Sequence, residues 1–152
     1  MPWWSRACDH GRVDEEVEHP QAGAVREAND AFYAAFEHGD LDAMAEVWEH
    51  SDRATVTHPG WPTLRGWPRV LASWDAIFRN TIDILFVLTD ADVQVDGDVA
   101  WVVLSENILQ GTPDAGDGDG LAGAHVSALN LFVRSRGAWR MVAHHGAPVA
   151  AG

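Results

Sequence analysis

Hydrophobic residues in the first part of the chain recur at helical spacing. One stripe predicts an amphipathic helix over residues 23–38, and it consists of Val25, Ala28, Phe32, Ala35 and Phe36. Gly39 suits the end of that helix, and Asp40 suits the N-cap of a second helix. The apolar face of the second helix consists of Leu41, Met44, Ala45 and Trp48.

A short strand and a third helix follow. Residues 54–58 alternate in a way that predicts a strand, which Pro59 and Gly60 then stop. The third helix is expected to begin near Pro68, since proline is well placed in a first helical turn. Its apolar stripe consists of Val70, Leu71, Trp74, Ile77 and Phe78.

From Ile82 onward the period of the pattern changes from helical to the two-residue period of strands. Strands are predicted over residues 84–95, 99–109, 124–134 and 138–145. Asp96-Gly97-Asp98 and Arg136-Gly137 indicate hairpin turns. Residues 111–120, GTPDAGDGDG, predict a solvated loop, because they lack the spacing and the terminal glutamate of a calcium-binding EF-hand loop.

This order of elements predicts an α+β fold with three N-terminal helices packed on a curved, mostly antiparallel sheet. Such a sheet can close into a cone whose mouth holds a ligand. The length of 152 residues suits one domain, predicted over residues 23–149, after an N-terminal tail or arm over residues 1–22. The eight tryptophans are compatible with a large apolar pocket and also with a densely filled core.

Charge and cysteine content narrow the classes of partner. The net charge is −13, and all ten basic residues are arginines without a basic run, so neither a nucleic acid nor an anionic membrane surface is an expected partner. Cys8 is the only cysteine, which rules out a disulfide within the chain. The sequence lacks both a 20-residue apolar stretch and the apolar core of a signal peptide, so a cytoplasmic location is expected.

Three stretches carry a resemblance to a known family. AFEHGDLDAMAEVWEHSDRATVTHP, LRGWPRVLASWDAIF and the ending GAWRMVAHHGAP resemble the NTF2-like superfamily, especially its SnoaL-like and ketosteroid-isomerase-like branches. The resemblance covers about residues 23–149 and implies the NTF2-like cone. The superfamily contains isomerases, polyketide cyclases, epoxide hydrolases, dehydratases and non-catalytic binding or association modules, so the fold does not by itself select an activity.

The resemblance implies site residues position by position. The general-base aspartate of ketosteroid isomerases ends the short strand just before a proline, and His58 stands at that position here. The isomerase oxyanion hole uses a tyrosine of the first helix and a protonated aspartate of the fourth strand. These positions correspond to Phe32, with Tyr33 one residue off that face, and to Asn130. All three residue types differ, so the resemblance does not extend to steroid isomerisation.

Strand alternation, combined with the resemblance, predicts which side chains face the pocket. In residues 99–109 the predicted inward set is Trp101, Val103, Ser105 and Asn107, and Glu106 is expected to point away. In residues 124–134 the predicted inward set is Val126, Ala128, Asn130 and Phe132. In the last strand Val142 and His144 are predicted inward, and those predicted outward are Met141, Ala143 and His145.

The candidate catalytic residues are His58 as general base, Asn130 as oxyanion donor and His144 as a second acid–base group. The alternatives are a histidine that fixes the Pro59 turn and an amide satisfied by the backbone. The predicted ligand-binding residues are Phe32, Trp48, Trp61, Trp74, Trp101, Ser105 and Asn107. No metal site is predicted, because His144 and its neighbour His145 point apart and no His-x-His or Cys-x-x-Cys spacing occurs.

These residues predict a pocket protein for a small apolar or aromatic molecule. If it is an enzyme, the expected chemistry is cofactor-independent isomerisation, cyclisation or dehydration of an apolar carbonyl, polyketide-like or terpenoid compound. The alternative is a non-catalytic ligand-binding or association module, in which His58 is packed and structural. A homodimer through the open sheet face is expected in either case.

Overall fold

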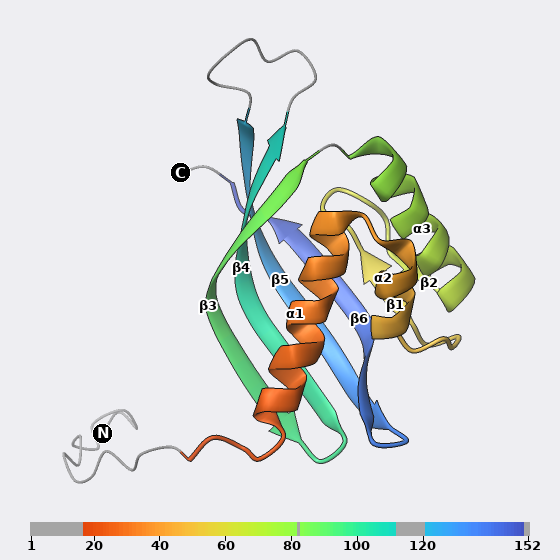
Figure 1. Cartoon of the computed structure of the whole chain (residues 1–152), viewed down its shortest axis with the longest axis vertical. Coiled ribbons are helices and arrows are strands. Elements are labelled where there is room, and N and C mark those ends of the chain that lie inside the picture. Colours follow the sequence, from red (N-terminus) through yellow and green to blue (C-terminus); the bar gives the residue numbers. More distant parts are fainter. Residues whose placement is uncertain (1–16, 82, 112–120, 151–152) are drawn as a thin grey trace, which may run out of the picture.

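The structure is a computed structural model, and it describes residues 17–81, 83–111 and 121–150 (Figure 1). Residues 1–16 of the predicted arm and 112–120 of the predicted loop lie outside the described residues. The elements in chain order are α1 Ala22–His38, α2 Leu41–Val47, β1 Thr55–Thr57, β2 Leu64–Arg65, α3 Trp67–Asn80, β3 Ile84–Asp96, β4 Val99–Gly111, β5 Leu121–Ser135 and β6 Ala138–Pro148. The predicted helices and strands are thus confirmed, and the two-residue strand β2 was missed.

The predicted helix boundaries and turns follow from local chemistry. Gly39 ends α1 with a left-handed φ of 59°. Asp40 caps α2, because its carboxylate accepts a hydrogen bond of 3.0 Å from the backbone N–H of Ala43. The turn between β5 and β6 has positive φ at both Arg136 and Gly137, 53° and 76°, as a tight hairpin requires.

All six strands form one mixed sheet in the order β2-β1-β6-β5-β4-β3. The long strands β3 to β6 pair antiparallel with their neighbours, and β1 alone pairs parallel, alongside β6. This parallel pairing sets Val56 opposite His144. The end of β1 and the last strand, far apart in the sequence, are thereby brought side by side.

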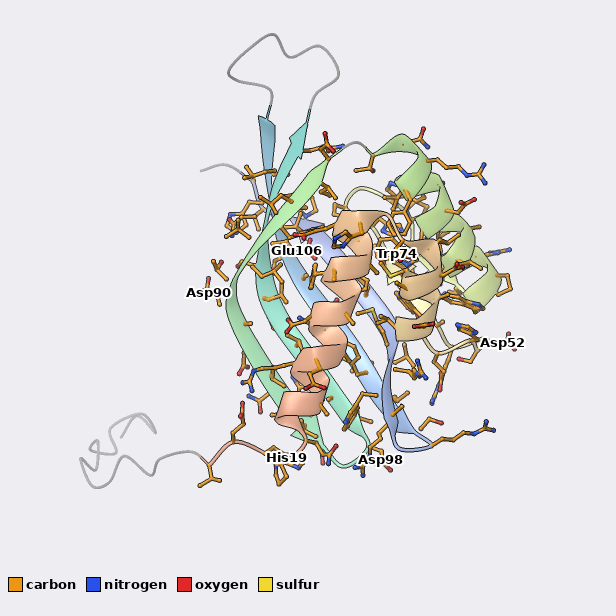
Figure 2. All side chains as sticks on the ribbon, in the orientation of Figure 1. His19, Asp52, Trp74, Asp90, Asp98 and Glu106 are labelled. Carbon is orange, nitrogen blue, oxygen red and sulfur yellow. The ribbon has the colours of Figure 1, made fainter. Side chains whose placement is uncertain are left out.

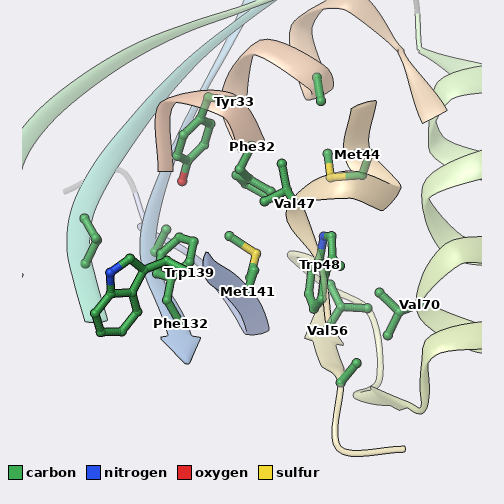
Figure 3. Close-up of a cluster of buried hydrophobic side chains, with 14 of the residues drawn as sticks. Phe32, Tyr33, Met44, Val47, Trp48, Val56, Val70, Phe132, Trp139 and Met141 are labelled. Carbon is green, nitrogen blue, oxygen red and sulfur yellow. The ribbon is translucent and has the colours of Figure 1, made fainter. Parts of the chain in front are cut away.

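The hydrophobic core lies between the helices and the sheet. In Figure 1, α1 crosses over one face of the sheet, and it contacts β3 and β6. The close-up in Figure 3 shows large side chains from the three helices and the sheet, and the labelled ones are Phe32, Tyr33, Met44, Val47, Trp48, Val56, Val70, Phe132, Trp139 and Met141. Among the described residues, no helix is both long enough and apolar enough to cross a membrane.

The predicted facing of β4 is wrong. The residues of β4 that are buried under the helices are Ala100, Val102, Leu104 and Glu106. The set predicted inward therefore lies on the outer face, where Val103 is 42% exposed. Apolar residues occupy both alternating positions of this strand, so its pattern does not select a face, and its pairing with β5 does. That pairing sets Val102 opposite the buried Asn130.

The predicted facing of β6 is correct at His144 and wrong at Met141. His144 is buried opposite Asn130, and His145 is exposed. The register between β5 and β6 shifts by one residue after Leu131, so Met141 pairs with Phe132 and is also buried. Such a bulge turns successive residues to the same side, which strict alternation does not anticipate.

Candidate functional site

Six polar side chains are buried inside the described part of the chain. They come from α1, the end of β1, α3, β4, β5 and β6 in turn: Asn29, His58, Ser73, Glu106, Asn130 and His144. Figure 2 shows the labels of Glu106 and Trp74 on opposite sides of α1. Buried polar groups are costly unless they are hydrogen-bonded, so their partners decide what this cluster can do.

His58 lies directly after β1 and bonds to α3. Its Nε2 is 2.9 Å from the Ser73 hydroxyl, which itself donates to the carbonyl of Val70 at 2.7 Å. The single hydroxyl proton of Ser73 is used in that bond, so Nε2 of His58 must be the donor in the first one. Neutral His58 therefore carries its proton on Nε2 and has a lone pair on Nδ1. Burial lowers the pKa of His58 to about 4.

His144 bonds to the neighbouring strand. Its Nδ1 is 2.5 Å from Oδ1 of Asn130. An amide oxygen only accepts, so Nδ1 donates and the lone pair of neutral His144 is on Nε2. Burial lowers the pKa of His144 to about 3, helped by the nearby positive charge that His58 and His145 would carry.

Asn130 connects His144 to α1 and β4. Its Nδ2 donates to Oδ1 of Asn29 at 2.8 Å and to the hydroxyl of Tyr33 at 3.2 Å. Tyr33 in turn donates to Oε1 of Glu106 at 2.6 Å. Burial raises the pKa of Glu106 to about 7, although the bond from Tyr33 opposes that rise. Burial and the adjacent Glu106 carboxyl raise the pKa of Tyr33.

Aromatic rings enclose the two histidines. The Trp74 ring centre is 4.7 Å from that of His58 and 6.0 Å from that of His144, and Phe32 is 4.9 Å from His144. The ring centre of Trp61 is 5.0 Å from that of His58, and Trp61 is 42% exposed. The indole N–H of Trp74 is buried, and it has no hydrogen-bond partner among the described residues.

The structure brings together some of the predicted site residues and separates others. The three candidate catalytic residues gather in one interior region, together with Phe32, Trp61 and Trp74. Three predicted ligand-binding residues instead lie on the outer face of β4, namely Trp101, Ser105 and Asn107. Trp48 is also buried, but it follows α2 rather than forming its last turn, and it packs against Trp67 at 6.3 Å.

The sequence analysis missed three of the six buried polar side chains, Asn29, Ser73 and Glu106, and it placed their neighbour Tyr33 off the pocket face. Glu106 had a usable signal, since it is the only carboxylate in β4. Tyr33 is the only tyrosine in the chain. The other two had no such signal, because Asn29 and Ser73 are ordinary residues of helices.

The interior around the histidines is closely packed. His58 and His144 are each 3% exposed and Trp74 is fully buried. Two hollows of 660 and 620 Å³ lie elsewhere: one next to His125 and Pro148, the other between Glu49, His50 and Arg140. Among the described residues no group of three histidine, cysteine or acidic side chains is arranged to hold a metal ion.

The fold and the chain's sequence together decide the family. Residues 25–151 match the SnoaL-like domain. The chain belongs to this family. A solved neighbour, a proposed dehydratase of the NTF2-like family from Streptomyces avermitilis, is 40% identical, with 85% of this chain and 96% of that one covered and a TM-score of 0.77.

The names of other proteins similar to this SnoaL-like chain point to different functions. A proposed calcium/calmodulin-dependent protein kinase type II association domain from Thiobacillus denitrificans is 30% identical, with 82% and 94% of the two chains covered and a TM-score of 0.72. A ketosteroid isomerase-like protein from Erwinia carotovora atroseptica shares the fold, with a TM-score of 0.70 at 19% identity over 88% and 100% of the two chains. F-box protein SKIP8 from Arabidopsis thaliana is 25% identical over 80% of this chain, which spans about half the length of that relative.

Proposed function

We propose that this SnoaL-like protein takes a small apolar or aromatic carbonyl compound into its interior and transfers protons on it without a cofactor. The observation that carries the proposal is the surroundings of Trp74. Two neutral imidazoles pack against this ring, each with one free lone pair by donor counting, and the indole N–H is buried without a partner among the described residues. A buried donor left unpaired costs about 1–3 kcal/mol, and a carbonyl oxygen would satisfy it.

The three groups divide the chemistry as follows. Nδ1 of His58 removes a proton next to the carbonyl group, and the Trp74 N–H stabilises the negative charge that develops on the oxygen. Both hydrogens of the Asn130 amide already reach Asn29 and Tyr33, so Asn130 can act as the predicted oxyanion donor only by releasing one of them. In the arrangement described above, Asn130 instead holds the ring of His144, and His144 is the second acid–base group.

The proton taken by His58 defines the reaction class. Its return to a different carbon gives an isomerisation, and its delivery to a departing hydroxyl gives a dehydration, with the electrons of the C–H bond forming the new double bond. Dehydration is favoured by the name of the 40%-identical neighbour. The low pKa of His58 is caused by burial alone, so entry of a polar ligand or water would bring this pKa back toward neutrality.

A second candidate function is a non-catalytic association module. It is favoured by the close packing of His58 and by the apolar outer face of the sheet, and the 30%-identical neighbour is named as an association domain. A homodimer through that face is part of both proposals, because Val103 and Leu129 lie opposite each other there and are 42% and 44% exposed.

The deciding experiment is NMR of protein labelled with ¹⁵N and ¹³C at its histidines, with and without a panel of aromatic, polyketide-like and terpenoid carbonyl compounds. The acid–base proposal expects a ligand that shifts the rings of His58 and His144 and raises the pKa of His58. His125 and His145, exposed on the outer face, are internal controls that the ligand should leave unchanged. If dilution shifts the outer pair and no compound shifts the inner pair, the association module is the correct function.

A further inference from the structure

We infer that Tyr33 and Glu106 are positioning residues which, through the amide of Asn130, hold His144 with its proton on Nδ1 and its lone pair on Nε2. The inference deepens the proposed function, because it names residues that prepare the second acid–base group of the same site. None of the hydrogen bonds described above joins Tyr33 or Glu106 directly to His58, His144 or Trp74. Their action on the chemistry would therefore pass through Asn130.

The first step concerns the direction of the bonds at Tyr33. Its hydroxyl has one proton and two polar neighbours, Oε1 of Glu106 at 2.6 Å and Nδ2 of Asn130 at 3.2 Å. The ionised Glu106 carboxylate only accepts hydrogen bonds, so Tyr33 must donate its single proton there. The Tyr33 proton therefore points to Glu106, and the lone pairs of its oxygen face Asn130.

The second step concerns the orientation of the Asn130 amide. With the Tyr33 oxygen acting as an acceptor, Nδ2 of Asn130 is the group that belongs beside it. Asn29 adds a second acceptor for the same NH₂ group at 2.8 Å. The carbonyl oxygen of Asn130 then faces β6, where it can only accept, so Nδ1 of His144 must donate.

The third step identifies Glu106 as the anchor of this chain. The amide pair Asn29–Asn130 could turn over as a unit, because each amide offers both a donor and an acceptor. A turned Asn130 would present its oxygen to Tyr33 and its NH₂ group to His144, which would move the histidine proton to Nε2. That arrangement requires the Tyr33 proton to leave Glu106, and so removes a hydrogen bond from a carboxyl group buried in the core.

The test reads the tautomer of His144 directly, by two-dimensional ¹H–¹⁵N NMR of the imidazole nitrogens at pH 8, above the Glu106 pKa of about 7. Glu106→Met removes the acceptor in a side chain of similar length, and we expect the ratio of the two His144 tautomers to move toward Nε2–H by at least about fivefold. Glu106→Gln retains a carbonyl acceptor and should keep the wild-type Nδ1–H form. Ser73→Ala, which alters only the partner of His58, is the matched control and should leave the His144 tautomer unchanged.

Tyr33→Phe supplies a second route to the same answer, should Glu106→Met fail to give a folded spectrum. It removes the hydroxyl that orients Asn130 and should also move the tautomer ratio toward Nε2–H. A wild-type protein with Nε2–H on His144, or an unchanged Nδ1–H form in the folded Glu106→Met or Tyr33→Phe variant, would overturn the inference. The readout needs no ligand, so it stays separate from the ligand panel, whose failure would refute the acid–base function alone.

Discussion

The inner face of the sheet carries Glu106, Asn130 and His144 beneath the helices, whereas the outer face of the same strands exposes Val103 and Leu129. Polar groups are thus buried where a core would be most stable without them, and apolar groups face outward where water would favour polar ones. Alternate residues of the same strands differ in this way, so local strand propensity explains neither the buried polar residues nor the exposed apolar ones.

The contrast separates two kinds of requirement. The inner polar groups are bonded to one another through a chain that runs from β6 across β5 and α1 to β4, which is expected of a site that must hold protons in defined places. The outer apolar groups form facing pairs, such as Val103 with Leu129 and Trp101 with Leu131, which suits burial against another protein surface. Substitutions on the inner face should therefore change the free energy of unfolding, whereas substitutions on the outer face should change the assembly of the protein.

The largest expected effect is on the inner face. Asn130→Ala removes the shared partner of Asn29, Tyr33 and His144, and it leaves a small cavity. We expect a loss of about 4 kcal/mol in the free energy of unfolding, measured by urea denaturation. Asn107→Ala on the outer face removes an exposed bond to the carbonyl of Val87 and should cost less than about 0.5 kcal/mol. Equal losses of unfolding free energy in Asn130→Ala and Asn107→Ala would contradict the difference between the two faces.

The outer face is tested by adding charge to it. Val103→Asp together with Leu129→Asp should weaken the proposed homodimer by at least about 100-fold, which corresponds to about 3 kcal/mol, because two carboxylates would have to be buried in the interface. Sedimentation velocity over a range of concentrations measures this change. Ala72→Asp, on an exposed position of α3, is the control and should leave the assembly unchanged. A wild-type chain that is monomeric at every concentration would refute the dimer.

The buried carboxyl predicts a pH-dependent difference between two proteins. The pKa of Glu106 is raised from 4.5 to about 7 in the folded chain, so its contribution to stability is fully present below pH 4.5 and is lost as the pH rises through 7. Glu106→Gln does not titrate. Relative to this variant, the wild type should lose roughly 2–3 kcal/mol between pH 4.5 and 8.

Urea denaturation of both proteins at pH 5, 6, 7 and 8 measures that loss. The comparison is needed because His58 and His144 act in the opposite sense. Their pKa values are lowered from 6.5 to about 4 and about 3, so their contributions are present above pH 6.5 and are lost as the pH falls toward those values. Both proteins contain these histidines, so their effects cancel in the difference. A difference that does not vary with pH would show that Glu106 keeps an ordinary pKa.

The smallest expected effect is the difference in unfolding free energy between substitutions of two serines, one on each side of the sheet. Ser73→Ala removes the acceptor for Nε2 of His58 and should cost about 1 kcal/mol in the free energy of unfolding. Ser127→Ala, at an exposed position on the outer face of β5, should change it by less than about 0.5 kcal/mol. Thermal unfolding of the two variants beside the wild type suffices. A stability loss for Ser127→Ala as large as that for Ser73→Ala would contradict this expectation, because it would mean that the Ser127 hydroxyl is also hydrogen-bonded.

Much of the fold could be predicted because its signals are local. Gly39 and Asp40 separate α1 from α2 by their own backbone and capping preferences, and the Arg136-Gly137 turn sets the β5–β6 hairpin. His58 was found as a candidate because Pro59 and Gly60 end its strand at a position that the family resemblance marks. The α+β class likewise follows from the order of periodic segments along the chain.

The sequence by itself therefore determined the helices, the strands other than β2, their order, the family and the position of His58. The tertiary structure alone decided which face of β4 is buried, that a bulge turns Met141 inward, and that Tyr33 meets Glu106, 73 residues away. The physical reason is that a strand with apolar residues at both alternating positions can be buried on either side. Its face is then chosen by cross-strand register, and the bonds of each buried polar group are chosen by the neighbours which that register supplies.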